Sequence, residues 1–269
     1  MRVAVITGAS SGLGREFARQ IDQTELDIDE IWLIARRADR LKETAAGLDH
    51  AARCIPLDLT APESVHSLEE LLENTVQVGV FVNCAGGAKI GNYAKMSAED
   101  ADNMIDLNCK AAVHTTLAVL PHMKAGDRII EICSTAAFQP LQHMNLYAAS
   151  KAFLYSYTRA LRMELLPRGI LVTAVCPWWV KDTEFIGTAR DNAANPDIDK
   201  AVRGFPLSTK SRRVVRLALR DSRIGLAVST PGIMCFLHRL LGKVIPRTWL
   251  LWFWEFFRRI GTRPAAPDN

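Results

Sequence analysis

Short apolar runs alternate along the chain with longer stretches in which apolar residues recur every three or four positions. The runs predict buried strands, and the periodic stretches predict helices that bury one face. The predicted strands are residues 2–8, 31–36, 53–59, 79–86, 127–134 and 170–177, and the predicted helices are residues 14–21, 39–48, 64–75, 99–123 and 145–166. Because strand and helix alternate, we expect parallel strands joined by right-handed helical crossovers.

This order predicts an α/β fold of Rossmann type, a doubly wound parallel sheet with helices on both faces. No repeat or long linker divides the 269 residues, and 49% of them are hydrophobic, enough for a large core. We therefore expect one domain over residues 1–230, with residues 231–269 as a basic, Trp-rich helical extension of the same domain.

Cysteine, histidine and charge narrow the class further. The six cysteines and six histidines show no ligand spacing, so the sequence predicts no metal site. The apolar run before Thr7 and Gly8 is too short for a signal peptide, which favours a cytoplasmic protein. Residues 1–200 carry 20 Lys+Arg against 26 Asp+Glu (−6), whereas residues 201–269 carry 13 against 3 (+10). The charge asymmetry therefore belongs to the C-terminal part of the chain.

Three glycines follow the first predicted strand and open the next helix, in the run "TGASSGLG". Gly8, Gly12 and Gly14 allow the backbone to turn sharply and to approach a pyrophosphate, which then lies at the N-terminus of the helix. Glycines at a strand–helix junction predict a dinucleotide site.

The second predicted strand ends in "IARR", with Ala35 where NAD sites usually place an acidic residue. Arg36 and Arg37 follow, and a guanidinium is the natural partner of a 2′-phosphate. The sequence favours NADP(H), with NAD(H) as the alternative cofactor. A solvated pair at a helix entry, partly neutralised by Asp39, is the other interpretation.

Tyr147 and Lys151 lie one turn apart in a predicted helix without Gly or Pro. A packed aromatic and a solvated lysine would explain an isolated pair. Reduction of a ketone, however, needs a proton donor, and an ammonium together with an oxidised nicotinamide favours the phenolate and lowers the pKa of the tyrosine. Ser134, at the end of a predicted strand, would supply a second hydrogen bond to the same carbonyl oxygen.

Five motifs in order, "TGASSGLG", "NCAG" (83–86), "MIDLNCKA", "EICSTAAF" and "YAASK" (147–151), together resemble the short-chain dehydrogenase/reductase family over about residues 1–185. The resemblance implies that Tyr147 is the acid/base and that Lys151 holds the nicotinamide ribose. It also implies that Ser134 binds the substrate oxygen and that Asn108 anchors a water on a proton path. A strand-end serine and an asparagine that bends its own helix are the alternatives.

The resemblance further implies a set of cofactor contacts, in which Asp58 would bind the adenine amine unless it merely caps a turn. It also implies a small-molecule carbonyl or alcohol substrate and a homo-oligomer, a dimer or tetramer. The implied contacts are Gly8, Ser10, Ser11, Gly12, Leu13, Gly14, Arg36, Arg37, Asp58, Leu59, Asn83, Ala85, Gly86, Tyr147, Lys151, Pro177 and Thr183.

The chain departs from the family pattern after the sixth strand, in "CPWWVKDTEF". Trp178 stands where many relatives have glycine, and Thr183 comes one residue later than their threonine, consistent with an insertion at Asp182. Trp178 and Trp179 are candidates for the wall of the nicotinamide or substrate pocket. The polar segment 185–206 lies where relatives carry a lid.

Two function classes remain. The first is an NADP(H)-dependent oxidoreductase that interconverts a carbonyl and a secondary alcohol, and the second is a cofactor-binding sensor or scaffold without turnover. The set of Asn108, Ser134, Tyr147 and Lys151 favours the first, because a pure binder has no need of the Ser–Tyr pair. No recognition helix or stacking module indicates nucleic-acid binding.

The C-terminal extension predicts two helices, an amphipathic one over 232–244 and a nearly all-apolar one that begins at Thr248 as N-cap and ends before Gly261. Neither reaches the roughly 20 apolar residues that span a bilayer. Two interpretations remain. The helices pack on the protein, over the cleft or against a second subunit, or they form a peripheral membrane contact for a hydrophobic substrate.

Overall fold

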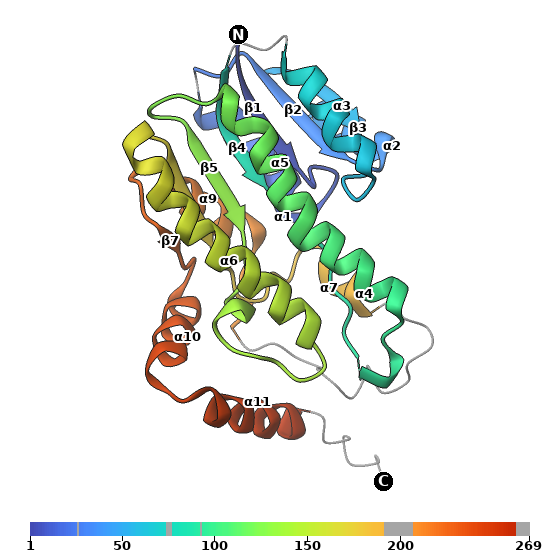
Figure 1. Ribbon diagram of the computed structural model, residues 1–269, viewed down its shortest axis with the longest axis vertical. Helices are drawn as coiled ribbons and strands as arrows, with labels where there is room; N and C mark the ends of the chain where they lie inside the picture. Colours follow the sequence, from blue (N-terminus) through green and yellow to red (C-terminus); the bar gives the residue numbers. More distant parts are fainter. Residues whose placement is uncertain (26, 74–76, 92, 191–206, 262–269) are drawn as a thin grey trace.

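The computed structural model describes residues 1–25, 27–73, 77–91, 93–190 and 207–261 (Figure 1). Seven parallel strands form one sheet in the order β3-β2-β1-β4-β5-β6-β7. Their bounds are β1 Arg2–Thr7, β2 Glu30–Ala35, β3 Ala51–Pro56, β4 Gln77–Asn83, β5 Arg128–Ile132, β6 Leu171–Val175 and β7 Val228–Ser229. The chain winds outward from β1 and then, in the other direction, from β4, which confirms the predicted Rossmann-type fold.

Helices cover both faces of this sheet, as predicted. On one face lie α1 (Gly12–Thr24), α2 (Ala38–Ala45) and α9 (Ser211–Arg223), and on the other lie α3 (Pro62–Glu73), α5 (Ala111–Val119) and α6 (Asn145–Leu165). Alternate strand residues serve the two faces: Val3 and Val5 pack toward α3, α5 and α6, whereas Ala4 and Ile6 pack toward α1, α2 and α9. Two separate cores therefore hold the sheet rigid between the helices.

Three local features differ from the sequence-based expectation. The helix predicted over 99–123 is α4 (Ala98–Ile105), a π-helical turn at Asp106–Lys110, then α5 and a 3₁₀ turn at Leu120–His122. The sequence analysis did not predict α9 or β7, which follow residues outside the described ranges. Helix α11 begins at Arg247, one residue before the predicted cap Thr248, directly after Pro246.

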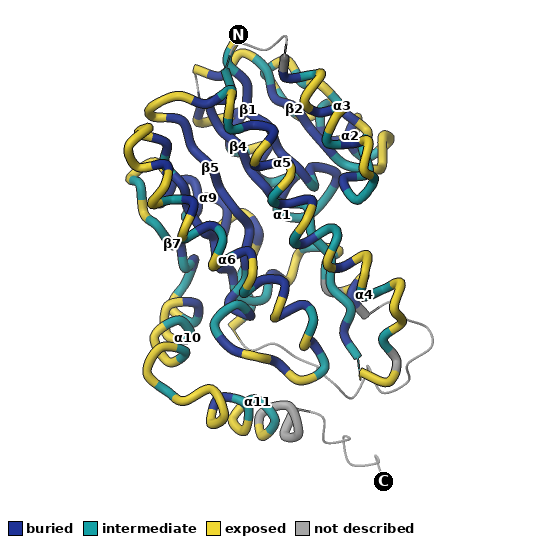
Figure 2. The backbone as a smooth tube through the Cα atoms, viewed as in Figure 1, coloured by how far each residue is buried: buried dark blue, intermediate teal, exposed yellow. Residues whose placement is uncertain are grey.

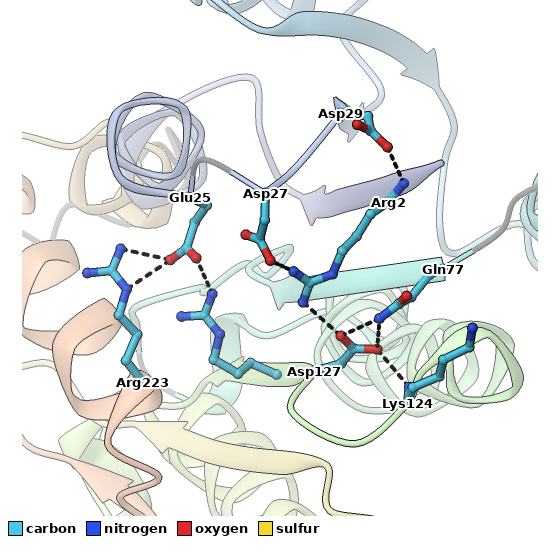
Figure 3. Close-up of polar contacts among 9 residues, drawn as sticks. Arg2, Glu25, Asp27, Asp29, Gln77, Lys124, Asp127 and Arg223 are labelled. Carbon is cyan, nitrogen blue, oxygen red and sulfur yellow. Dashed lines mark hydrogen bonds and ion pairs between the residues drawn. The ribbon is translucent and has the colours of Figure 1, made fainter.

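Ion pairs fasten the amino ends of the strands, opposite the glycine-rich turn (Figure 3). Glu25, at the end of α1, accepts from Arg128 of β5 at 2.5 Å and from Arg223 of α9 at 2.8 Å. Asp127 accepts from Arg2 of β1 at 2.8 Å. These ion pairs lie at the amino ends of the strands, whereas ligands of doubly wound sheets bind at the carboxyl ends.

Helices α10 (Ile233–Val244) and α11 (Arg247–Gly261) lie beyond the carboxyl ends of the strands, at the lower end of the molecule in Figure 1. Figure 2 shows long exposed stretches on both helices. In the part of the chain that is described, no helix combines the length and apolarity needed to cross a membrane.

Candidate active site

A cleft of about 1420 Å³ opens at the carboxyl edge of the sheet. The turns after β1, β2, β3 and β4 form one end of it, which we call the polar end because it holds the glycine-rich turn together with Arg36, Arg37 and Asp58. The start of α6, the loop after β6, α7 (Phe185–Arg190), α10 and α11 form the other end. The position matches the ligand-binding edge of doubly wound sheets.

The glycine-rich turn forms the floor of the polar end, and two of its glycines allow no side chain. Gly8 has φ +67°, and a Cβ there would lie 2.9 Å from the backbone nitrogen of Ala85. A Cβ on Gly14 would lie 2.2 Å from the carbonyl oxygen of Gly8. The turn is thus packed against the loop after β4, and α1 starts at Gly12 with its N-terminus at the cleft. Its N-cap Ser11 forms no side-chain cap hydrogen bond, so the first backbone N–H groups of α1 suit an anion.

Thr7 ties this turn to β4, and sequence reasoning missed it. Its hydroxyl accepts from the backbone nitrogens of Cys84 and Ala85 at 2.9 and 3.0 Å. It donates to Asn83 at 3.1 Å, and the Asn83 amide in turn donates to the carbonyl of Ala112 at 2.9 Å. Asn83 is buried and does not line the cleft, unlike the other predicted cofactor contacts. Its place is beneath the site, where it joins β1, β4 and α5.

The two arginines after β2 have different surroundings. Arg37 reaches across the cleft mouth to Glu184 at 3.2 Å and to the hydroxyl of Ser10 at 3.3 Å. Arg36 is 73% exposed, and its nearest carboxylate is Asp58 at 3.9 Å. Arg36 is therefore the more available cation for an additional ligand phosphate.

Asp58 follows β3 and faces the same end of the cleft. One of its oxygens accepts from the backbone and hydroxyl of Thr60, at 3.1 and 2.7 Å. Burial raises the pKa of this carboxyl, but the Thr60 hydrogen bonds and the Arg36 charge outweigh that effect and the pKa lies below its ordinary value. One oxygen of Asp58 thus caps the turn, as the alternative interpretation expects, and the other oxygen lies 3.9 Å from Arg36.

Ser134 and Tyr147 both line the cleft. Ser134 lies two residues after the end of β5 and caps the short turn Thr135–Phe138, where its oxygen accepts from the backbone nitrogen of Ala136 at 3.1 Å. Tyr147 lies in the first turn of α6 and is 7% exposed. Hydrogen bonding with Ser134 lowers the pKa of the Tyr147 phenol.

The sequence-based expectation of a lowered Tyr147 pKa includes the charge of a bound oxidised nicotinamide, whereas the effects described here are those of the protein alone. Burial is the largest effect and raises the pKa of Tyr147 to about 12, despite the hydrogen bond with Ser134. Burial also lowers the pKa of the Lys151 ammonium. In the protein alone, then, Tyr147 holds its proton more firmly than free tyrosine does.

Lys151 lies on the same face of α6, one turn after Tyr147, and is 4% exposed. Its ammonium donates to the carbonyl oxygen of Ile132 at 2.8 Å. A Cβ on Gly86 would come within 3.3 Å of this ammonium and 3.2 Å of the Asn108 side-chain oxygen. The loop after β4 thus approaches Lys151 as closely as its backbone allows.

Asn108 lies in the π-helical turn, fully buried, and does not line the cleft. Its amide exchanges two hydrogen bonds of 2.9 Å with the backbone of Gly87, and it donates to the hydroxyl of Ser150 at 3.0 Å. Asn108 therefore clamps the loop after β4 to α6. The alternative that Asn108 bends its helix by bonding its own backbone does not describe these contacts, because the side chain bonds Gly87 and Ser150.

The loop after β6 closes the cleft between the two ends. Pro177, Trp178, Trp179 and Thr183 all line it, which agrees with the predicted wall of tryptophans. The Thr183 side chain lies against the glycine-rich turn, since a Cβ on Gly12 would be 3.4 Å from it. Asp182, the expected insertion, caps α9 through Ser211 at 2.8 Å. Of the predicted lid, α7 lies at the cleft, and residues 191–206 lie outside the described residues.

Helices α10 and α11 form the wall of the apolar end, a role that sequence reasoning left among its alternatives. The wall residues are Met234, Leu237, His238, Leu241, Ile245, Leu250, Phe253 and Trp254. His238 fits edge-on between Phe138 and Trp178, with ring centroids 6.0 and 5.5 Å away. Burial lowers the pKa of His238 to about 4, so its ring is neutral at physiological pH. Only helical periodicity in the tail could have indicated these residues.

The predicted site residues thus converge, with two exceptions. Asn83 and Asn108 lie behind the cleft, and the following line it: Gly8, Ser10, Ser11, Gly12, Leu13, Gly14, Arg36, Arg37, Asp58, Leu59, Ala85, Gly86, Ser134, Tyr147, Lys151, Pro177 and Thr183.

The outward-wound sheet, the glycine-rich turn and the Ser134–Tyr147–Lys151 cluster define a Rossmann-type oxidoreductase. The chain belongs to the short chain dehydrogenase family, whose model matches residues 2–194. An uncharacterized oxidoreductase of Staphylococcus epidermidis is 31% identical over 190 residues, which are 70% of this chain and 81% of that protein.

Solved structures give the same relationship. A short-chain dehydrogenase from Sphingobium yanoikuyae, in complex with NADPH, has 27% identity and a TM-score of 0.76, with 100% of both chains covered. One from Burkholderia cenocepacia, in complex with NADP, has 28% identity and a TM-score of 0.68, covering 81% of this chain and 89% of that one.

Proposed function

We propose that the protein is an NADP(H)-dependent oxidoreductase that interconverts a carbonyl and a secondary alcohol on a hydrophobic substrate. The observation that carries this proposal is the meeting of Ser134 and Tyr147 in a cleft whose one end is polar and glycine-rich and whose other end is apolar. Residues 231–269 belong to the same domain in this proposal, because α10 and α11 line the cleft. We also propose that the protein forms a homo-oligomer.

The polar end fits a dinucleotide. Gly8 and Gly14 leave no room for a Cβ, and the N-terminus of α1 faces the cleft, as binding of a pyrophosphate requires. Arg36 would pair with a 2′-phosphate, since it is exposed and its only close carboxylate in the described chain is 3.9 Å away. The NADPH and NADP complexes of the two related structures support this choice. When bound, the nicotinamide supplies or accepts the hydride.

The residues of the chain would manage the proton and the orientation. Tyr147, with its pKa raised to about 12, is protonated at neutral pH and would donate to the developing alkoxide. Ser134 would donate a second hydrogen bond to the same oxygen. The buried Lys151 would hold the nicotinamide ribose, in a position that Ile132 and the Gly86 loop fix.

The apolar end supports a hydrophobic carbonyl substrate. Its wall combines Trp178 and Trp179 with the apolar sides of α10 and α11, and His238 is the neutral polar group among them. A long-chain or polycyclic ketone fits this composition better than a small charged substrate does.

The first test is turnover by Tyr147→Phe, measured with NADPH and a panel of aldehydes, ketones, quinones, steroids and 3-oxoacyl thioesters. We expect a loss of about 10²–10⁴-fold in kcat, because a general acid is removed, with nearly unchanged NADPH affinity. Tyr157→Phe is the matched control, since Tyr157 lies on the same helix but outside the cleft.

Retention of most of the turnover by Tyr147→Phe would refute Tyr147 as the proton donor. Saturable NADPH binding with no turnover on the whole panel would instead favour a cofactor-binding sensor or scaffold. The binding result and the turnover result are independent, because NADPH binding is measured by nicotinamide fluorescence in the absence of substrate.

A further inference from the structure

The outer sides of α10 and α11 carry a continuous set of large apolar side chains, which we call the outer stripe. It consists of Ile233, Phe236, Leu240, Val244, Trp249 and Trp252, each between 48% and 73% exposed. These positions recur every three or four residues, so they form one face of each helix. Figure 2 shows both helices largely exposed. Exposure of so many large apolar groups side by side is a mark of an interaction surface.

The outer stripe is distinct from the cleft wall but continuous with it. None of its six residues lines the cleft, so the two helices present one apolar side to the cleft and another to the surroundings. Leu237, Leu241 and Phe253 belong to the cleft wall and are nevertheless 40%, 45% and 51% exposed. They form an apolar path from the outer surface into the substrate end of the cleft.

Positive charge accompanies the stripe. Lys243 and Arg247 are exposed beside it, and neither forms an ion pair within the described part of the chain. Residues 201–269 as a whole carry 13 Lys+Arg against 3 Asp+Glu. A partner that covers this face must therefore accommodate large apolar side chains together with the cations Lys243 and Arg247.

We infer that the outer stripe docks the protein onto an anionic lipid surface, with the apolar end of the cleft opening toward the bilayer. Tryptophans suit the headgroup boundary, and lysine and arginine beside them suit anionic lipid. A second copy of the chain fits less well, because a twofold contact through these short helices would bring Lys243 and Arg247 toward their own counterparts. Entry of a hydrophobic substrate from the lipid rests on the proposed function, but the docking itself does not.

The test is co-sedimentation with phosphatidylcholine vesicles prepared with and without phosphatidylserine, at low ionic strength and without cofactor or substrate. We expect the full-length protein to sediment with the anionic vesicles and to be released by salt. Trp249→Ser/Trp252→Ser should remove sedimentation. Lys243→Ala/Arg247→Ala should weaken binding about 25-fold, at about fivefold for each cation near an anionic surface.

Matched controls separate this face from general stickiness and net charge. Met163→Ser/Ile224→Ser removes apolar groups that are 63% and 64% exposed elsewhere, and Arg213→Ala/Arg216→Ala removes two exposed cations from α9. Both controls should sediment like the wild type. An equal loss in the α9 variant would overturn the assignment, as would a wild-type protein that stays in the supernatant.

A tryptophan variant that still sediments but changes from dimer to monomer in light scattering would also overturn the inference, because the occupant would then be a second copy. Thermal unfolding of each variant shows that it is folded. Since sedimentation needs no turnover, absence of oxidoreductase activity would leave this result unaffected.

Discussion

Glu131 offers a prediction that depends on one buried carboxyl. It lies on β5 with 0% exposure, and one oxygen accepts from the Thr116 hydroxyl at 2.8 Å. The other oxygen is buried without a hydrogen-bond partner among the described residues. Burial raises the pKa of Glu131 from 4.5 to about 7, against the lowering effect of the hydrogen bond from Thr116.

The raised pKa predicts how stability depends on pH. Below the unfolded pKa of 4.5 the carboxyl is protonated in both the folded and the unfolded state, so its burial does not lower the free energy of unfolding through ionisation. Between pH 4.5 and about 7 the unfolded state loses its proton and the folded state keeps it, so stability falls as pH rises. Above this window the cost is complete, about 3 kcal/mol at about 1.4 kcal/mol per pKa unit. Glutamine is neutral at every pH and retains a side-chain oxygen that can accept from Thr116. Glu131→Gln therefore avoids the cost of ionising a buried carboxyl.

Urea unfolding of wild type and Glu131→Gln across this pH range measures the difference. We expect equal stability at about pH 4.5 and a gain of about 3 kcal/mol for the variant at about pH 8. Glu164→Gln, at an exposed position of α6, should stay within about 0.5 kcal/mol of wild type throughout. A gain for Glu131→Gln that does not change with pH would refute the reasoning, because the effect would then come from packing.

Two further predictions concern the polar end of the cleft. Gly86→Ala should lower kcat about tenfold, because the new Cβ would lie 3.3 Å from the Lys151 ammonium and 3.2 Å from Asn108. Gly87→Ala, whose Cβ would meet only Leu107 at 3.7 Å, should retain wild-type turnover, and equal losses in both variants would contradict the assignment. Arg36→Asp should cut the preference for NADPH over NADH by about tenfold to a hundredfold, as titration of both cofactors would show. Arg40→Asp, outside the cleft and paired with Glu43, should leave the preference unchanged; equal wild-type affinities would contradict the role of Arg36.

Features encoded by neighbouring residues could be predicted from the sequence. The glycine-rich turn requires a positive φ at Gly8 and at Gly12, which glycine supplies locally. The apolar runs of β1, β2 and β4 identify strands that helices cover on both sides. Tyr147 and Lys151 are one turn apart in one helix, so helical spacing is enough to bring them to one face.

Features that depend on packing between distant segments could not be predicted. Asn83 looks like a cleft residue because it ends a strand, but Thr7 and Ala112 hold its side chain inside. The raised pKa of Tyr147 comes from burial that α7 and the loop after β6 help to create, through contacts such as Phe185 against the tyrosine ring at 5.7 Å. Periodicity identified α10 as amphipathic, but only the fold shows that two apolar sides of it face different surroundings.

The surroundings of Tyr147 determine which protonation state the cofactor-free protein offers to the proposed reaction. Tyr147 is buried in an apolar cluster with residues such as Met104, Leu141 and Met144, and burial raises the pKa of its phenol to about 12. A phenol with that pKa carries its proton throughout the physiological range, which is the state that reduction of a carbonyl consumes. Oxidation of an alcohol would need the phenolate, and in this chain the cation on the same helix face is Lys151, whose own pKa burial lowers. In the proposed mechanism, formation of the phenolate for alcohol oxidation would therefore depend on the positive charge of a bound oxidised nicotinamide.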